Sequence, residues 1–209
     1  MRRRFWSTIA ELELENALDQ GMPSSFPDLK ADCGAPSNCM DEVVNPEMEH
    51  MPVAQPDSEF TLSSYQRMAS KSYSLRKQIT CFLNGSSPRP SHVDVLVLDD
   101  RVLQCLDDIP AWGQSGSLLP RALLQLQLYQ MLLRLHRNFY NSLERQHSHS
   151  RSTSVRAARA IIDLHHELMA KGCRVLMIFR HDIRNAALSV CYDFVTSQEI
   201  TSKGEVHLS

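Results

Sequence analysis

The most apolar stretch of this 209-residue chain runs from Leu118 to Leu135, inside a predicted helix that continues to about Leu143, and its polar residues restrict what it can form. A helix that spans a bilayer needs about 20 consecutive, predominantly apolar residues. Polar side chains interrupt this stretch at short intervals, at Arg121, Gln125, Gln127, Gln130 and Arg134. The pattern predicts a helix that is apolar around most of its circumference, which is typical of the centre of a helical bundle. We therefore expect a core helix here and no membrane partner.

Further helices are predicted where apolar residues recur every three or four positions. They cover Arg2 to Gln20, Thr61 to Leu83, Ser91 to Ile109, Ser154 to Lys171, and a last segment ending near Thr196. The core-facing residues are expected to be Phe5, Trp6, Ile9, Ala10, Leu12 and Leu14; Leu62, Tyr65, Met68, Ser72, Leu75, Ile79 and Phe82; Val95, Leu98, Val102, Leu106 and Ile109; and Val155, Ala158, Ile161, Ile162, His165 and Leu168. No pair of strands is evident. The sequence thus predicts an all-α fold, an irregular multi-helix bundle of about six helices.

Local signals mark several helix ends. Ser91 and Ser154 are predicted N-caps, since a serine hydroxyl can accept a hydrogen bond from a free N–H of the first turn. Gly21-Met22-Pro23, Pro110 and Lys171-Gly172 are predicted stop signals, because glycine permits the turn that ends a helix and proline cannot continue one.

A proline-rich acidic connection, residues 22–59, separates the first two predicted helices. It holds six of the ten prolines, and the stretch from Asp32 to Gln66 contains seven acids and no Lys or Arg. Such a long connection is uncommon inside a compact domain, so it is either extended over the surface or partly disordered. We also expect a polar loop at 144–154 and a C-terminal tail at 197–209, after a single domain that covers residues 1–196.

The charge balance argues against direct contact with DNA. The chain has 22 Lys and Arg against 24 Asp and Glu, a formal charge of −2, whereas binding a phosphate backbone usually needs a basic excess. Two small basic clusters, Arg2 to Arg4 and Arg151 with Arg156 and Arg159, have no interleaved aromatic residues. We interpret both clusters as solvated surface.

The six cysteines do not predict a metal site. They are Cys33, Cys39, Cys81, Cys105, Cys173 and Cys191, and no two of them form a C-x-x-C pair. A structural zinc site needs four ligands that converge on one point, which closely spaced pairs supply. We expect free thiols, with Cys81, Cys105 and Cys191 packed as small apolar side chains.

No motif supports an enzyme. His166-Glu167 begins like the zinc-protease helix H-E-x-x-H, but Ala170 occupies the position of the second histidine. We predict instead that His165 packs inward and that His166 is solvated. The Gly113–Gly116 turn lacks the glycine spacing of a nucleophile elbow, and the pairs Asp99-Asp100 and Asp107-Asp108 are expected on solvated faces.

Four short motifs follow one another along the chain. They are a basic run with an aromatic pair, an acid and a later G-x-P; a proline and asparagine before two acids; an L-x-x-I-P-x-W turn; and a leucine-rich helix ending in H-R. Their marker positions are Arg3, Arg4, Trp6, Glu11, Gly21, Pro23, Pro36, Asn38, Asp41, Pro110, Trp112, His136 and Arg137. In these motifs and their order, the stretch from Arg2 to about Thr196 resembles the fungal-specific transcription factor domain, the middle homology region of fungal zinc-cluster regulators.

The resemblance implies the regulatory region of a nuclear regulator of RNA polymerase II transcription, often of a metabolic or biosynthetic gene cluster. It begins inside the family domain, and the cysteines here do not match the family's zinc module. Zinc and DNA contact are therefore expected only in a missing N-terminal module, with no cofactor in this chain. The resemblance implies the transcription machinery or co-regulators as partners, allows a small-molecule effector and a homodimer, and gives the marker positions a structural role.

Two differences from the family pattern lead to separate expectations. Asn138 stands where the family usually has proline after the H-R pair, so we expect the helix to continue towards Leu143. If Met1 is the true start, the alternative is a truncated, stand-alone helical interaction protein without direct DNA binding. That alternative predicts exposed apolar surface, and hence self-association.

Overall fold

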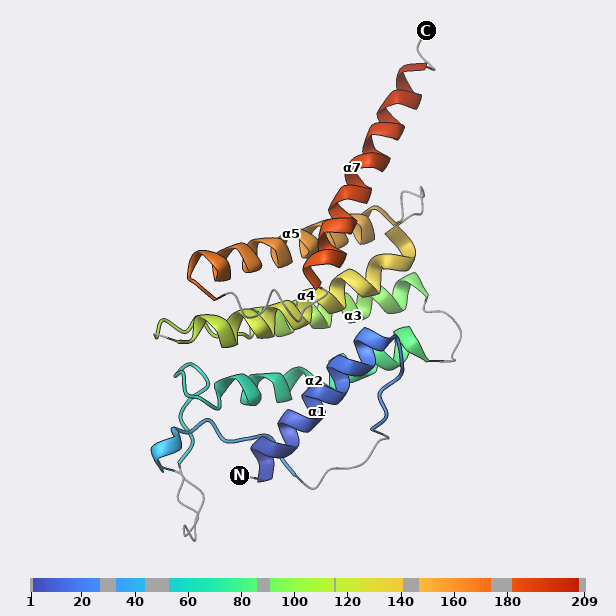
Figure 1. Ribbon diagram of the computed structural model, residues 1–209. Coiled ribbons are helices and arrows are strands. Elements are labelled where there is room, and N and C mark those ends of the chain that lie inside the picture. Colours follow the sequence, from blue (N-terminus) through green and yellow to red (C-terminus); the bar gives the residue numbers. More distant parts are fainter. Residues whose placement is uncertain are drawn as a thin grey trace. The chain divides into compact units, whose positions relative to one another are not determined.

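The computed structural model describes residues 2–26, 33–43, 53–85, 91–114, 116–140, 147–173 and 182–206, the last ten of these as backbone only. These residues form six α-helices and a short 3-10 helix, without a strand. The elements in Figure 1 are α1 (Arg2–Gln20), η1 (Asp41–Val43), α2 (Ser64–Asn84), α3 (His92–Asp107), α4 (Leu118–Tyr140), α5 (Ser148–Ala170) and α7 (Asp182–Val206). The predicted all-α fold is confirmed. Of the described helices, none is both long and apolar enough to cross a membrane.

Local sequence signals set several of the observed ends. Ser91 caps α3 through a capping box, in which its hydroxyl accepts from the Asp94 N–H while the Asp94 carboxylate accepts from the Ser91 N–H. α1 ends at Gly21, whose φ of 66° is a left-handed conformation that glycine adopts without a steric penalty. α5 ends in the same manner before Gly172, at φ 81°.

The chain forms two compact units, Met1–Leu128 and Tyr129–Ser209, so that α4 contributes to both. In the first unit α1 packs along α2, and α2 also contacts α3. One core cluster joins α2 to the turn before α4 and to α4 itself; it consists of Met68, Ala69, Trp112 and Leu124, with Phe60, Tyr65 and Ile109 packed against it.

The second unit is built on the contact between α5 and α7. The side chains it buries from these two helices include three alanines, Ala157, Ala158 and Ala186, together with the larger Ile161 and Leu168. Alanine allows two helix backbones to approach closely. The predicted inward face of α5 is confirmed, with Ala158, Ile161, His165 and Leu168 buried and Val155 and Ile162 half-buried.

The buried face of α1 differs from the prediction. Ala10 and Leu14 are buried as predicted, but Phe5 and Leu12 are 71% and 61% exposed, whereas the polar residues Ser7 and Glu11 are buried. The prediction was wrong for Phe5 and Leu12 because the most regular apolar pattern on α1 does not mark its contact face: Glu11 meets an arginine of α2 there. Leu62 was also misplaced, since it precedes α2 and is 71% exposed.

Two helices of the C-terminal half, α5 and α7, are longer than predicted. α5 begins at Ser148, so Ser154 is a buried residue inside the helix and not its N-cap, and residues 148–154 are not loop. α4 passes through Asn138 to Tyr140, and the extension to Leu143 lies outside the described residues. α7 continues to Val206, where a tail was expected.

Two predictions about burial need correction. Cys191 is exposed, and Cys81 and Cys105 are only partly buried, while Cys39 is the cysteine that is buried. Asp99, expected on a solvated face, is 1% exposed. All six cysteines are free thiols. The proline-rich connection 22–59 lies partly outside the described residues and stays a prediction, as does the single domain 1–196.

Candidate functional site

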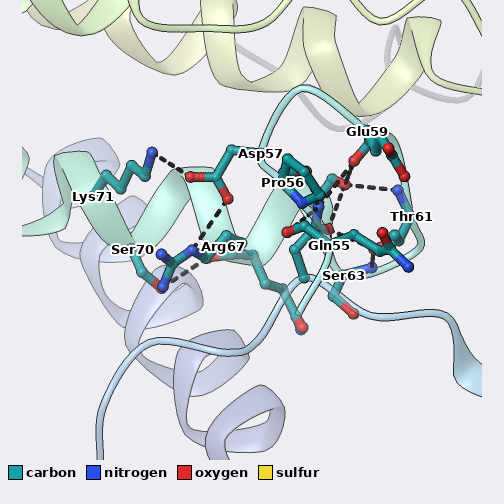
Figure 2. A network of polar contacts seen from close by, with 12 residues as sticks. Gln55, Pro56, Asp57, Glu59, Thr61, Ser63, Arg67, Ser70 and Lys71 are labelled. Carbon is teal, nitrogen blue, oxygen red and sulfur yellow. Dashed lines mark hydrogen bonds and ion pairs between the residues drawn. The ribbon is translucent and has the colours of Figure 1, made fainter. Parts of the chain in front are cut away.

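Asn38 is the centre of a polar network at the N-terminal side of α2. Its side chain is buried, and its Nδ2 donates to the backbone carbonyls of Pro56, at 2.8 Å, and Glu59, at 2.9 Å. Its Oδ1 accepts from Thr61 Oγ1, at 2.6 Å, and from Ser64 Oγ, at 2.8 Å. An asparagine amide has two N–H donors and two lone pairs, so these four bonds satisfy the side chain. Asn38 thereby fixes the course of residues 55–64, which we call the pre-α2 turn. Figure 2 shows residues of this turn, among them Pro56, Glu59 and Thr61.

Arg4 ties α1 to the same network. Its guanidinium donates to Ser63 Oγ at 2.6 Å and to the Cys39 carbonyl at 3.3 Å, and it forms an ion pair with Asp41. The Ser63 hydroxyl also donates to the Cys39 carbonyl, at 2.9 Å. Arg4, Asn38 and Asp41, from two separate motifs, therefore lie around one point of the first unit.

A third motif also contacts the pre-α2 turn. Trp112 Nε1 donates to the backbone carbonyl of Asp57 at 2.9 Å, and the Trp112 ring lies against Phe60 with centroids 5.4 Å apart. The Asp57 carboxylate points towards α2, where it meets Lys71 at 2.6 Å and Arg67 at 3.3 Å (Figure 2). Partial burial opposes the charge of Asp57, but Lys71 and Arg67 outweigh burial, and the pKa of the carboxyl lies below its ordinary value.

A buried ion pair joins α1 to α2. Arg76 donates two parallel hydrogen bonds to Glu11, at 2.6 and 2.8 Å, and the two side chains are 1% and 8% exposed. The guanidinium also donates to Ser72 Oγ and to the Ala69 carbonyl. Burial opposes the charge of Arg76, yet Glu11 raises the pKa of the guanidinium. Arg76 is therefore a fully engaged interior cation.

Gln127 of α4 extends this pair into a network of three helices. Its Nε2 lies 2.7 Å from Glu15 Oε1, 2.9 Å from the Tyr65 hydroxyl and 3.3 Å from Glu11 Oε2. Polar groups that are matched in this way across three helices permit one packing arrangement and disfavour others. The arrangement positions helices; it holds no reactive group next to an open space.

The second unit has two buried polar pairs of its own. His136 Nδ1 and Ser150 Oγ are 2.9 Å apart and link α4 to α5. His165 Nε2 lies 3.2 Å from Asp182 Oδ1 and links α5 to the first residue of α7. The prediction that His165 packs inward and His166 is exposed is confirmed.

The remaining marker residues lie apart from these networks. The Trp6 ring stacks on Phe26, with centroids 5.5 Å apart. Pro36 is buried and Pro110 half-buried, whereas the others are exposed: Arg3, Gly21, Pro23 and Arg137. Sequence reasoning missed Arg76, Gln127 and the hydroxyls of Thr61, Ser63 and Ser64. Arginine and glutamine inside apolar helical patterns were the signal that could have found the first two.

A small cavity lies beside α2 in the first unit. Its walls combine apolar side chains with a thiol and two charged groups: Met68, Lys71, Ser72, Cys105, Asp108, Ile109, Leu124 and Leu128. Its volume of about 30 Å³ has room for one or two water molecules and not for a metabolite. Within the part of the chain that the structure describes, no three metal-binding side chains gather at one point.

Comparison with known proteins relates the chain to regulators of transcription. It is 26% identical over 215 residues to transcription factor phm2 of Pyrenochaetopsis sp., covering 92% of this chain and 29% of the relative. It is 24% identical over 230 residues to the Zn(2)-C6 fungal-type transcription factor mpsB of Macrophomina phaseolina, covering 99% and 31%. The curated homologues of this chain are fungal transcription factors.

A further relative points the same way. The equisetin cluster transcription factor eqxF of Fusarium heterosporum is 24% identical over 213 residues, which cover 92% of this chain and 30% of eqxF. The chain thus spans about a third of the length of the relatives it matches. No protein-family model matches the chain, and no solved structure is significantly similar to it.

Proposed function

We propose that this chain is the regulatory region of a fungal zinc-cluster-type transcription factor that controls RNA polymerase II transcription. The observation that carries the proposal is the alignment of nearly the whole chain with proteins named transcription factors. These relatives are named as transcription factors and not as enzymes. The candidate site agrees with this, because its polar side chains form hydrogen bonds to one another. DNA contact would belong to a zinc-cluster module elsewhere in a longer protein, which would act in the nucleus.

The geometry of the site suits a regulatory region that transmits a signal through a change in the packing of its helices. Arg4, Asn38 and Trp112 hold the pre-α2 turn in place through separate contacts, and Glu11 and Arg76 hold α1 on α2. Such networks have one satisfied state, because losing one partner leaves buried groups without hydrogen bonds. A co-regulator or small molecule that binds more tightly to a second packing arrangement of these helices would shift the population from the first arrangement towards the second. We propose a structural role of this kind for the marker residues that belong to these networks: Arg4, Glu11, Asn38 and Trp112.

We further propose that the regulated genes form a biosynthetic cluster. The support is the relative eqxF, which is a transcription factor of the equisetin cluster. The natural test is to delete the gene that encodes this chain in its host and to compare all transcripts with those of the parent strain. Coordinated loss or gain of transcripts from a contiguous group of genes is expected. Unchanged transcripts under conditions in which the protein is present would overturn the proposal.

A pair of chromosomal variants tests whether the polar network takes part. Asn38→Ala removes the centre of the network, whereas Gln55→Ala changes an exposed side chain at the start of the same turn. We expect Asn38→Ala to alter transcription of the target genes at equal protein level, measured by immunoblot, and Gln55→Ala to behave as the parent. Equal transcription in both variants would contradict a regulatory role for this turn.

A further inference from the structure

The exposed side of α3 is apolar in its first half and acidic in its second half. Val93 and Val97 are 69% and 56% exposed. Asp100, Asp107 and Asp108, which follows the last residue of the helix, are exposed as well. Steps of four, three and seven residues separate Val93, Val97, Asp100 and Asp107, so their side chains lie on one side of the helix. We call these five residues the α3 face.

The fold makes use of other polar side chains of α3 but not of the acids on this face. Asp94 completes the capping box with Ser91, and Asp99 is buried. Arg101 donates to Gln78 of α2, at 2.9 Å, and is therefore turned towards α2. Among the described residues, no basic side chain forms an ion pair with an acid of the α3 face. Contacts of the described residues thus leave the negative charge of the face uncompensated.

The position of two of these acids opposes the stability of the helix. Free carbonyl groups give the last turn of a helix a partial negative charge, which favours cations there. α3 instead ends with Asp107 and Asp108, and its last turn has no basic residue. Local conflicts of this kind are expected at functional sites, where binding and not folding selects the residue. A cationic ligand would relieve this one.

We propose that the α3 face binds a basic amphipathic helix of a separate protein. Apolar side chains of the partner cover Val93 and Val97, and its Lys or Arg side chains lie beside the three acids. Charge complementarity identifies the partner, because a negative surface attracts a positive one and disfavours acidic competitors. The partner is helical because the backbone groups in the middle of α3 are bonded within the helix. The contact therefore relies on side chains, and a helix presents a row of them without unpaired backbone groups.

This inference rests on the proposed function in one respect, since it takes the partner to be a co-regulator of transcription. The two can nevertheless fail separately. A chain that controls its target transcripts but binds no basic helix would overturn the present inference alone. A chain that binds the helix while all transcripts stay unchanged in the deletion strain would overturn the proposed function alone.

Fluorescence anisotropy of a labelled peptide tests the contact. The probe is a peptide of about 18 residues with Leu on one helical face and Lys elsewhere, titrated with the reduced full chain. Because the contact is small, we expect a Kd of about 10–300 µM that becomes weaker as salt is added. The same peptide with Glu in place of Lys should bind at least about tenfold more weakly. A wild type that binds both peptides equally, or neither, overturns the proposal.

The double variant Asp107→Lys with Asp108→Lys gives the sharpest outcome, because binding and stability should change in opposite directions. Binding of the Lys peptide should weaken at least about tenfold, since like charges then face one another. The urea midpoint should rise, since cations suit the end of a helix. The matched control is Asp163→Lys with Glu167→Lys, two exposed positions of α5 that give the same change in net charge. Equal loss of binding in both doubles, or no loss in either, overturns the proposal.

The apolar half of the face has a test of its own. Val93→Ser and Val97→Ser should each weaken peptide binding about threefold to tenfold, because each removes apolar area from the contact. Leu12→Ser, at a position of α1 that is 61% exposed, is the control and should bind as the wild type does. If the valine variants bind as tightly as the control, the contact is electrostatic alone and the proposed amphipathic partner is wrong.

Photo-cross-linking in the host tests the source of the partner. A benzoylphenylalanine in place of Gln104, an exposed residue one turn from both Asp100 and Asp107, lies at the contact. Mass spectrometry of the product should identify a Lys- or Arg-rich segment of another protein. A cross-link to the same polypeptide, to a second copy of this chain or to an acidic segment would give the α3 face another occupant and overturn the proposal.

Discussion

The two units bury polar side chains in different ways. In Met1–Leu128 the interior holds a charged pair, Arg76 with Glu11, and an asparagine whose amide groups are all engaged. In the described part of Tyr129–Ser209 the interior polar contacts include two histidine pairs, and small side chains such as Ala158 and Ala186 are fully buried. A charge buried in the first unit depends on its partner, since an unpaired buried charge is costly. The stability of the second unit depends more on close packing of its helices.

The tryptophans allow the two units to be followed separately. Trp6 and Trp112, the only two in the chain, both belong to the first unit. Tryptophan fluorescence therefore reports unfolding of Met1–Leu128, while far-ultraviolet circular dichroism reports the helices of both units. Four substitutions, taken from the largest expected effect to the smallest, test the comparison.

Arg76→Met leaves the Glu11 carboxylate buried without its cation, and we expect it to lower the free energy of unfolding of the first unit by about 3–5 kcal/mol. The measurement is urea unfolding followed by tryptophan fluorescence. The double variant Glu11→Leu with Arg76→Met removes both charges and should recover most of the loss. The control is Arg101→Met, at an exposed position of α3. A double variant as unstable as Arg76→Met would show that packing, and not the unpaired charge, dominates.

Asn38→Ala removes four hydrogen bonds from the pre-α2 turn, and the expected loss is about 2–3 kcal/mol, since each buried group left unsatisfied costs about 1–3 kcal/mol and some will rebind water. The same fluorescence assay measures it, with Gln55→Ala as the exposed control. If both variants have the same midpoint, Asn38 does not stabilise this unit.

Ala186→Leu tests the packing of the second unit. Ala186 is fully buried, and inserting a larger side chain into a packed core costs about 1–3 kcal/mol. The neighbouring Ala187 is exposed, so Ala187→Leu is the matched control and should cost little. Circular dichroism should show an earlier transition for Ala186→Leu while the tryptophan transition stays in place. A shifted tryptophan transition would show that the two units unfold together.

Asp57→Asn should have the smallest effect, below about 1 kcal/mol, because Asp57, Arg67 and Lys71 are all partly exposed and screened by solvent. The pKa of Asp57 is lower in the folded chain than its ordinary value near 3.8. Its stabilising contribution is thus complete above that value and is lost as the pH falls through the folded pKa. The difference between wild type and Asp57→Asn in urea unfolding should be constant from pH 5 to 7 and shrink below about pH 4. A difference that grows on acidification would contradict the assignment.

How far the sequence predicted this chain depends on the reach of each signal. The Ser91 cap, the glycine ends of α1 and α5 and the passage of α4 through Asn138 were predicted correctly, because each depends on neighbours within about one helical turn. The start of α5 was wrong, because a run of serines and histidines reads as loop. In the second unit Ser150 is buried against His136. The hydrogen bond between them satisfies the Ser150 hydroxyl inside the helix.

The candidate site shows the same difference between local signals, which were predicted, and distant contacts, which were not. The motifs singled out Arg4, Asn38 and Trp112, but nothing in them indicated that all three meet the pre-α2 turn. Their partners, such as Ser63 and Thr61, are unremarkable in sequence. Arg76 and Gln127 were missed because a polar residue on a helix is ordinarily solvated, and only its partner shows otherwise.

The sequence by itself determined that this chain is helical, where most of its helices lie and which class of regulator it resembles. The helical fold and the helix positions follow from the 3.6-residue period and from caps, which act between residues three or four positions apart. The resemblance to a class of regulator rests on the four short motifs and their order. The tertiary structure alone decided which face of α1 is buried, since Glu11 meets Arg76 across 65 positions and Gln127 meets Glu15 across 112. Contacts of that range depend on how helices come together in space, and no local pattern encodes them.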